Sequence, residues 1–319
     1  MDAVQTTGYS SRIEHHGRGG ELFLIHIVNL VFKVLTLGIY HFWGVTRIRR
    51  YLWAQTAFDG ERLEYTGNGL ELFLGFLKGL LIYMLAIVAF VALSGLLSMV
   101  HEVVAAIAMF AVIPFVYFAI GAIQYSALRY RLNRTTYRGI RLGLAGSAKD
   151  YGLIHLRWGV FTALTLGLAL PWGQVAKQRY RLGNVRFGNR EGQFDGSGGD
   201  LFRTYIICWL LAPFTLGLSI VWYQAAMIRY TADRFTIGNL AFCSSVTGGS
   251  LFLLLLTNML ILMFTFGLGM PWVMTRSLRF FTDHTQVSGQ ADYASIYQTQ
   301  EKTPSTAEGF AEGFDLGAI

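Results

Sequence analysis

Residues 165–180 read TLGLALPWGQVAKQRY, and three other segments of the chain repeat this pattern at the same offsets. The corresponding segments are TLGIYHFWGVTRIRRY at 36–51, TLGLSIVWYQAAMIRY at 215–230 and TFGLGMPWVMTRSLRF at 265–280. In each, a threonine stands seven residues before a tryptophan, and an arginine followed by an aromatic residue stands seven residues after it. Repetition at a fixed offset is the signature of a repeat architecture. The chain is therefore predicted to consist of tandem units.

A fifth, enlarged copy lies between Gly67 and Gly146. It retains Arg129 and Tyr130, but Ala122 takes the place of the tryptophan, 79 residues after Trp43 instead of 50. The extra length is roughly that of one more membrane crossing. We predict units at about 17–66, 67–145, 146–195, 196–245 and 246–282, preceded by a polar segment, 1–16, and followed by a flexible polar tail, 283–319.

The composition of the 319-residue chain indicates a membrane protein. Hydrophobic residues make up 53% of it and charged residues only 14%, whereas soluble domains have roughly 25% charged residues. Two cysteines exclude a disulfide scaffold. The net charge of +7 fits basic residues that flank membrane segments and face anionic lipid, so membrane lipids are the expected partner and nucleic acid is not.

Two topologies are open, and the distribution of Lys and Arg favours one of them. The linkers 44–70, 129–150, 173–200 and 223–250 carry four, six, five and two basic residues, whereas 98–102 carries none. Single crossings would place basic linkers alternately on both faces, against the positive-inside tendency. If each unit enters and returns, all basic linkers share the cytoplasmic face, which is the arrangement that we expect.

The Thr-Leu-Gly element suits such a return. Gly38, Gly167, Gly217 and Gly267 each follow a helix of about 15 residues, which is roughly 22 Å long and short of the ~30 Å bilayer core. Glycine favours the end of a helix, and Pro171 and Pro271 suit the first turn of the next one. The predicted fold class is an all-α polytopic membrane protein, with tandem repeats of broken-helix hairpins joined by small β-hairpin linkers such as the one at Asp59-Gly60.

The chain resembles the YjgN family of bacterial inner-membrane proteins, which carry a domain of unknown function. The resemblance rests on Glu21-Leu22-Phe23, Thr36-Leu37-Gly38, Leu170-Pro171-Trp172, Arg179-Tyr180 and Phe187-Gly188, and it covers residues from Gly17 to about Thr282. Two units depart from the Pro-Trp form, and the enlarged copy lacks the tryptophan. The resemblance implies a multi-pass protein of the bacterial cytoplasmic membrane. It implies no activity, so it assigns no catalytic residue.

The repeated tryptophans and arginines are the candidate ligand or lipid-binding residues, because the planar arginine side chain suits phosphate and carboxylate groups. They are Trp43, Arg50, Trp172, Arg179, Trp222, Arg229, Trp272 and Arg279. The alternative, which we favour from the sequence, is an aromatic belt with interfacial anchors.

Polar residues within apolar runs form a second candidate set, because charge inside a bilayer is costly and often functional. Asn29 and Asn258 share one position in the repeat, 14 residues before the tryptophan, and Lys33 lies 11 residues beyond Leu22. Helix–helix hydrogen bonding by the asparagines and snorkelling by the lysine are the structural alternatives.

Two function classes remain. Repeats, helix breaks and intramembrane polar residues are typical of transporters, which favours a permease or channel-like protein for a small solute or lipid. A non-transporting membrane scaffold or lipid-organising protein is the alternative. The sequence contains no metal-ligand or nucleophile motif and implies no cofactor, so an enzyme has no motif behind it.

Overall fold

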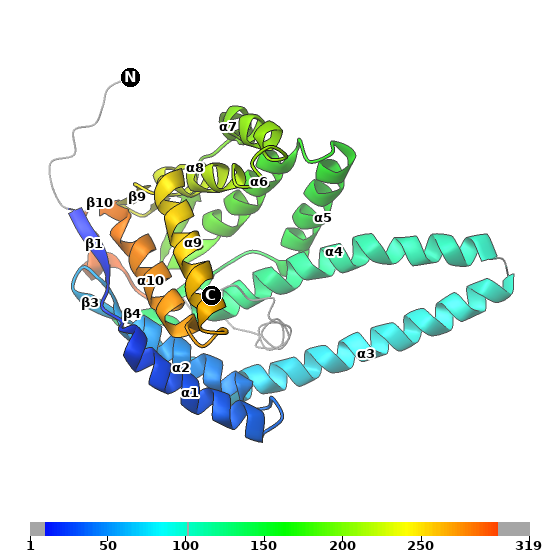
Figure 1. Ribbon diagram of the computed structural model, residues 1–319, viewed down its shortest axis with the longest axis horizontal. Helices are drawn as coiled ribbons and strands as arrows, with labels where there is room; N and C mark the ends of the chain where they lie inside the picture. The colour runs from blue at the N-terminus through cyan, green and yellow to red at the C-terminus, as the bar shows by residue number, and fades with distance from the viewer. Residues whose placement is uncertain (1–9, 101, 299–319) are drawn as a thin grey trace.

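The computed structural model describes residues 10–100 and 102–298, and within them helix pairs alternate with β-hairpins. Figure 1 shows the helices spreading from one end of the molecule, where the strands gather. The helices are α1 (Gly19–Leu35), α2 (His41–Ala54), α3 (Gly69–Val100), α4 (Glu102–Asn133), α5 (Ala148–Leu164), α6 (Leu170–Gly183), α7 (Gly198–Leu211), α8 (Ile220–Asp233), α9 (Gly248–Phe264) and α10 (Met270–Asp283).

The strands close into a barrel in the order β1-β10-β9-β8-β7-β6-β5-β4-β3-β2, with every pair antiparallel. They are β1 (Ser10–His15), β2 (Thr56–Phe58), β3 (Glu61–Tyr65), β4 (Thr135–Tyr137), β5 (Ile140–Leu144), β6 (Val185–Phe187), β7 (Arg190–Phe194), β8 (Phe235–Ile237), β9 (Leu240–Ser244) and β10 (Thr285–Ser288). The first and last strands pair with each other, Ser11 opposite Val287, so the two ends of the fold complete the barrel.

The predicted all-α polytopic fold is therefore wrong. The strands lie in the linkers between helix pairs, but they form one closed sheet instead of separate hairpins. The strands have three to six residues each, too few for a recognisable alternation of apolar and polar residues. In addition, each hairpin pairs with hairpins one whole helix pair away in the chain, so no local pattern reveals the pairing.

The chain ends contribute two of these strands. β1 lies in the segment 1–16, for which the sequence indicated no structure, and β10 lies within the predicted tail. The rest of that tail, from residue 299 onwards, falls outside the described residues.

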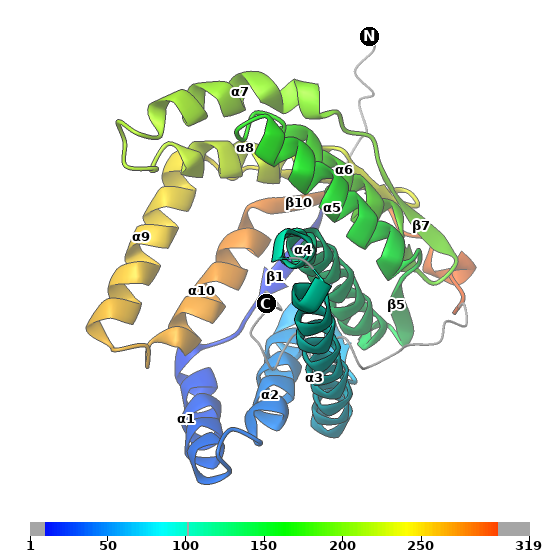
Figure 2. The ribbon, with the colours of Figure 1, turned by 90° about the vertical axis from the view of Figure 1, so that its right-hand side faces the viewer.

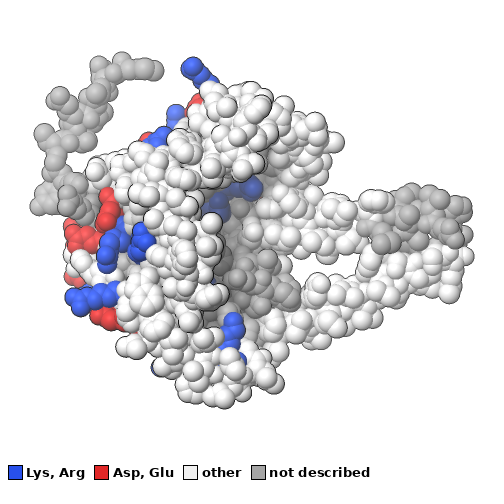
Figure 3. Space-filling view, in the orientation of Figure 1, with Lys and Arg blue, Asp and Glu red and all other residues white. Residues whose placement is uncertain are grey.

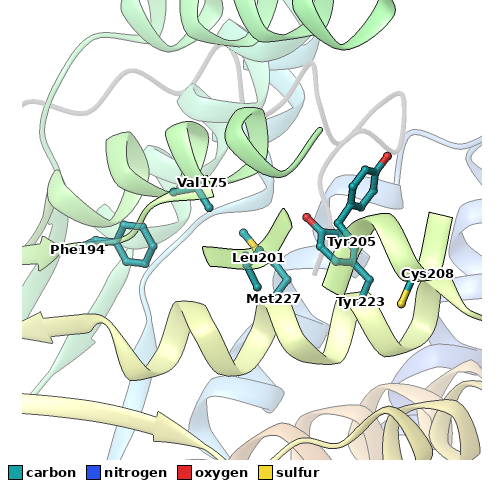
Figure 4. Close-up of a cluster of buried hydrophobic side chains, with 7 residues drawn as sticks. All are labelled: Val175, Phe194, Leu201, Tyr205, Cys208, Tyr223 and Met227. Atoms are coloured by element: carbon teal, nitrogen blue, oxygen red, sulfur yellow. The ribbon is translucent and has the colours of Figure 1, made fainter. Parts of the chain in front are cut away.

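The helices form a ring in which each helix packs against the next in the chain and α10 packs against α1 (Figure 2). The core is divided among the junctions of this ring. One cluster joins Val175 of α6, Phe194 of β7, Leu201, Tyr205 and Cys208 of α7, and Tyr223 and Met227 of α8 (Figure 4). Smaller clusters lie at other junctions, as expected where units bury their apolar faces only against neighbours.

The enlarged unit forms a long arm, α3 and α4, that extends beyond the ring (Figure 1). Among the described residues, only two helical segments are long and apolar enough to cross a bilayer, Gly69–Leu96 and Val112–Asn133, and both belong to this arm. The helices of the other four pairs have 14 or 17 residues, which corresponds to about 21–26 Å.

Candidate functional site

The repeated tryptophans lie at the junctions between successive units. Trp172 packs against Phe202 with 4.9 Å between ring centroids, and its backbone and ring leave no room for a Cβ atom on Gly198. The same arrangement recurs for Trp43 with Gly69, Trp222 with Gly248 and Trp272 with Gly19. The last of these contacts joins the final unit to the first and so closes the ring.

The repeated arginines lie at the same junctions and hydrogen-bond to the backbone. Arg50 donates to the Gly67 carbonyl over 3.3 Å, and Arg279 donates to the Gly17 carbonyl over 2.9 Å. Arg179 and Arg229 donate to the carbonyls of Gly196 and Val246. Each acceptor lies where a strand leads into the first helix of the following unit. The eight candidate residues thus occupy four separate junctions, and their role in ligand binding stays a prediction.

The tyrosine that follows three of these arginines has a function that sequence reasoning missed, whereas Arg279 is followed by Phe280, which has no hydroxyl. The Tyr180 hydroxyl lies 2.7 Å from the Ser147 backbone nitrogen and 3.0 Å from its carbonyl oxygen. Tyr51 and Tyr230 make the same two contacts with Arg18 and Ser197. Each tyrosine therefore holds the start of the first helix in its own unit, while the preceding arginine holds the start of the next unit. The 33-residue spacing between tyrosine and helix start is the signal that could have revealed this.

The two candidate asparagines join the two helices of their own hairpins. Asn29 Nδ2 donates to the Gly44 carbonyl over 3.2 Å, and Asn258 Nδ2 donates to Ser277 Oγ over 3.1 Å. Both side chains are buried. Lys33, in contrast, is exposed in the last turn of α1. The structure does not bring these three residues together.

The Thr-Leu-Gly break is a turn that satisfies its own polar backbone groups. Thr165 Oγ1 donates to the Phe161 carbonyl over 2.7 Å and accepts from the Ala169 nitrogen over 3.0 Å. Gly167, with φ of +95°, donates to the Thr162 carbonyl over 2.7 Å. The turns at Thr36, Thr215 and Thr265 repeat these hydrogen bonds. Such a turn can enter hydrocarbon, where unpaired backbone groups cost several kcal/mol.

The residue at the tip of each turn is large, apolar and almost fully exposed. Leu37, Leu216 and Phe266 are 94–95% exposed and Leu166 is 82% exposed. All four adopt φ of 48–50°, a left-handed conformation that is unusual for such residues. The tips therefore present apolar side chains away from the protein. Charged side chains gather at the barrel end, whereas the visible part of the arm carries none (Figure 3).

The barrel end holds a buried histidine. His15 is 5% exposed, and its Nδ1 lies 2.9 Å from Thr56 Oγ1. Burial, with the positive charge of Arg279 and His16 nearby, lowers the pKa of His15 to about 4. The side chain is thus neutral at physiological pH. Because Thr56 donates its own proton to the Leu52 carbonyl, His15 carries its proton on Nδ1.

Residues 289–298, which we call the C-terminal strap, cross the turns of four β-hairpins. The Tyr293 hydroxyl lies 3.3 Å from that of Tyr137 and 3.4 Å from Asp59 Oδ2, and Arg138 lies 4.2 Å from the ring centroid. Burial and the hydrogen bond with Tyr137 raise the pKa of Tyr293.

Further contacts of the strap reach the remaining hairpins. Arg190 donates to Ser295 Oγ over 2.8 Å, and Asn189 Nδ2 donates to the Ser295 carbonyl over 3.2 Å. Asp292 and Ile296 line a small pocket with Gly238 and Asn239. The strap therefore covers the end of the barrel that faces away from the helices.

The chain is similar in sequence to bacterial proteins of a family whose function is unknown. The family described as "Bacterial protein of unknown function (DUF898)" matches residues 10–218 and 207–313. The inner membrane protein YjgN of Salmonella typhimurium, strain LT2, is 27% identical over 117 residues, which are 37% of this chain and 28% of that protein. The inner membrane protein YjgN of Escherichia coli K12 is 40% identical over 58 residues, 18% of this chain and 15% of that protein. No solved structure matches the chain.

Proposed function

This chain belongs to the DUF898 family of bacterial proteins of unknown function, and we propose that it is an inner-membrane protein whose ring of short helical hairpins organises lipid. The observation that carries the proposal is the exposed apolar tip of each Thr-Leu-Gly turn. An exposed apolar surface of this extent is unstable in water and marks a membrane or interaction site. The names of the two YjgN relatives point to the same membrane.

The lengths of the helices support two depths of insertion. The four short pairs, at about 21–26 Å, do not reach across a ~30 Å hydrocarbon core, so they enter one leaflet and return. The arm has helices of 32 residues each, about 48 Å, and crosses. The barrel and its basic residues then lie on the cytoplasmic side, in agreement with the positive-inside tendency.

This arrangement favours lipid organisation over a permease. The wall of a conduit must cross the bilayer, and among the described residues only the arm is long enough to do so. The buried asparagines, which suggested a transport pathway, each donate a hydrogen bond between the two helices of their own hairpin. A closed ring of apolar hairpins within one leaflet instead surrounds and orders the lipid that it contacts.

Cysteine accessibility in spheroplasts tests the insertion. Each chain keeps a single cysteine, because Cys208 is replaced throughout and Cys243 is replaced wherever another reporter is introduced. The barrel reporters Glu61→Cys, Arg141→Cys, Glu191→Cys and the native Cys243 should all react with a membrane-impermeant maleimide only after the membrane is opened. Leu37→Cys, Leu166→Cys and Leu216→Cys at the tips should stay protected on both sides. Labelling of the barrel reporters on alternating sides would contradict the proposal.

Reconstitution separates the two function classes. Proteoliposomes with spin-labelled lipid should show an immobilised lipid component that grows with protein content, without faster efflux of entrapped potassium or carboxyfluorescein. The matched control replaces the tip residues, Leu166→Ser and Leu216→Ser, and should immobilise less lipid. Protein-dependent efflux that the tip variants retain would instead indicate a permease.

A further inference from the structure

One unit carries a group of unpaired basic side chains between α5 and α6. Lys177 and Arg181 stand one turn apart on α6, and both interact electrostatically with His155 of α5. The close contact of Gly173 with Trp158 sets this register. The two helices run in opposite directions. Lys177 lies one turn after Gly173 on α6, and His155 lies about one turn before Trp158 on α5, so the two side chains are near each other.

No other residue that the structure describes makes a hydrogen bond with the His155 side chain. It is 9% exposed, and its ring lies 4.4 Å from that of Tyr117 between centroids. Its Nδ1 and the Nε of Arg181 are buried, and neither makes a hydrogen bond. In the part of the chain that the structure describes, no ion pair or hydrogen bond reaches the ammonium group of Lys177 either. A buried polar atom without a partner costs free energy that a ligand can recover.

Three of the other four units show that the fold does not require these charges, whereas the enlarged unit has Ala127 and Arg131 at the two positions. The positions of Lys177 and Arg181 are Ile48 and Leu52 in the first unit, Met227 and Thr231 in the fourth, and Ser277 and Phe281 in the fifth. These units build the same helix pair with uncharged residues. Two like charges one turn apart on a helix are moreover destabilising. The basic pair in the third unit therefore lacks a structural reason.

We propose that His155, Lys177 and Arg181 form a binding site for a phosphate group. Arginine and lysine are the side chains that proteins use for phosphate, and charge-assisted hydrogen bonds are the stronger ones. The site lies in the half of the hairpin nearer the barrel, because Arg181 is in the last turn of α6. If the hairpins enter one leaflet, as the proposed function has it, this is the depth of lipid headgroups. The phosphate is then that of an anionic lipid, and a free phosphate has the same chemistry.

Binding of defined probes to the purified full-length chain in an uncharged detergent tests the site. The probes are dioleoylphosphatidylglycerol, dioleoylphosphatidylcholine as the net-neutral comparison, and inorganic phosphate as the free anion. Lipid binding is followed by native mass spectrometry, and the protection that each of the three probes gives is followed by thermal shift. The test variant is Lys177→Gln/Arg181→Gln. The matched control is Arg157→Gln/Arg203→Gln, which removes the same charge from exposed positions on α5 and α7.

The test variant should bind phosphatidylglycerol about tenfold or more weakly than the wild type, since two charge-assisted hydrogen bonds are lost, and the control should bind like the wild type. Without ligand, the test variant should unfold at the same temperature as the wild type or higher, because a like-charge pair is gone. Equal loss of binding in both variants, or in neither, would overturn the site.

The same titrations identify the source of the phosphate. Protection by inorganic phosphate as strong as that by phosphatidylglycerol indicates a site for the free anion, whereas protection by the lipid alone indicates a headgroup site. Binding in detergent does not depend on how the hairpins insert, so failure of the cysteine-accessibility test would leave the phosphate site standing and remove only the lipid as its source.

Discussion

His15 occupies a position that other units fill with Tyr65, Leu144 or Phe194, two residues before the junction. All four side chains are buried, whereas Ser244, at the same position before the last unit, is half-buried, so in four of five cases the position serves the packing of the barrel against the helices. Histidine adds a titratable group there. The repeat offsets predict which residues are equivalent, but they do not indicate that His15 is buried. A polar segment with two adjacent histidines is typical of an exposed part of the chain.

Acid should destabilise the protein through His15. Its pKa is about 4 in the folded chain and 6.5 when exposed, so on acidification the unfolded state takes up a proton first. The stabilisation is complete above pH 6.5 and is lost as the pH falls to about 4, by an amount on the order of 3 kcal/mol. Thermal unfolding in detergent, followed by tryptophan fluorescence between pH 7.5 and 4, measures this loss.

His15→Phe removes the titrating group but fills the position as Phe194 does in another unit. The variant should lose the part of the pH dependence between 6.5 and 4, at the cost of the hydrogen bond to Thr56, worth about 1 kcal/mol. A variant that keeps the full pH dependence would show that another group is responsible.

Among the elements, the helix break and the strap differ in how far the sequence predicts them. Gly38, Gly167, Gly217 and Gly267 lie in the turns as expected, and Pro171 and Pro271 begin the next helices. These features are local, because capping and left-handed residues act within a few positions of the chain. The strap depends on hydrogen bonds with hairpins 105 to 234 residues away, which no local pattern contains.

Thr165→Val should destabilise the third hairpin. Valine keeps the shape of threonine but removes the hydroxyl, so the Ala169 backbone N–H loses its acceptor. An unsatisfied buried group costs about 1–3 kcal/mol, and the midpoint of thermal unfolding in detergent should fall accordingly. Thr165→Ser keeps the hydroxyl and should remain close to the wild type. Equal midpoints for the two variants would mean that the hydroxyl does not support the turn.

Tyr293→Ala should release the strap from the barrel. The ring and hydroxyl of Tyr293 contact Tyr137, Arg138 and Asp59, so their loss should lower amide protection in residues 289–298 by about tenfold or more in hydrogen exchange. Tyr297→Ala, at a position that is 66% exposed, is the control and should leave protection unchanged. If both variants exchange like the wild type, the backbone contacts alone hold the strap.

In the molecule as a whole, the closed ring joins residues from both ends of the chain. Arg279 binds the Gly17 carbonyl, Trp272 packs on Gly19, and β1 pairs with β10. These three contacts repeat what happens at the internal junctions. Closure leaves the sheet without free edges.

An engineered disulfide can test the closure. Arg12 is opposite Gln286 in the register, and Gln286 is in turn opposite Cys243. In chains without Cys208, oxidation of Arg12→Cys/Gln286→Cys/Cys243→Ser should link the two ends and speed migration on a non-reducing gel. Gln286→Cys with the native Cys243 should also form a bond. Arg12→Cys with Cys243 spans two strand spacings and should not, because disulfides need Cα atoms within about 7 Å. Failure of the first pair alone would mean an open sheet.

The order of residues along the chain was sufficient to predict the helix breaks with their glycine and proline residues and the apolar character of the surface, because each depends on local offsets or on composition. Only the folded chain decided that the linkers form one closed barrel, that the tryptophans and arginines bind the following unit, and that a single unit holds an unpaired basic cluster. The barrel arises from pairing between segments that are far apart in the chain, and the other features depend on how neighbouring elements pack. The free energy of such pairing depends on packing and hydrogen bonding in three dimensions.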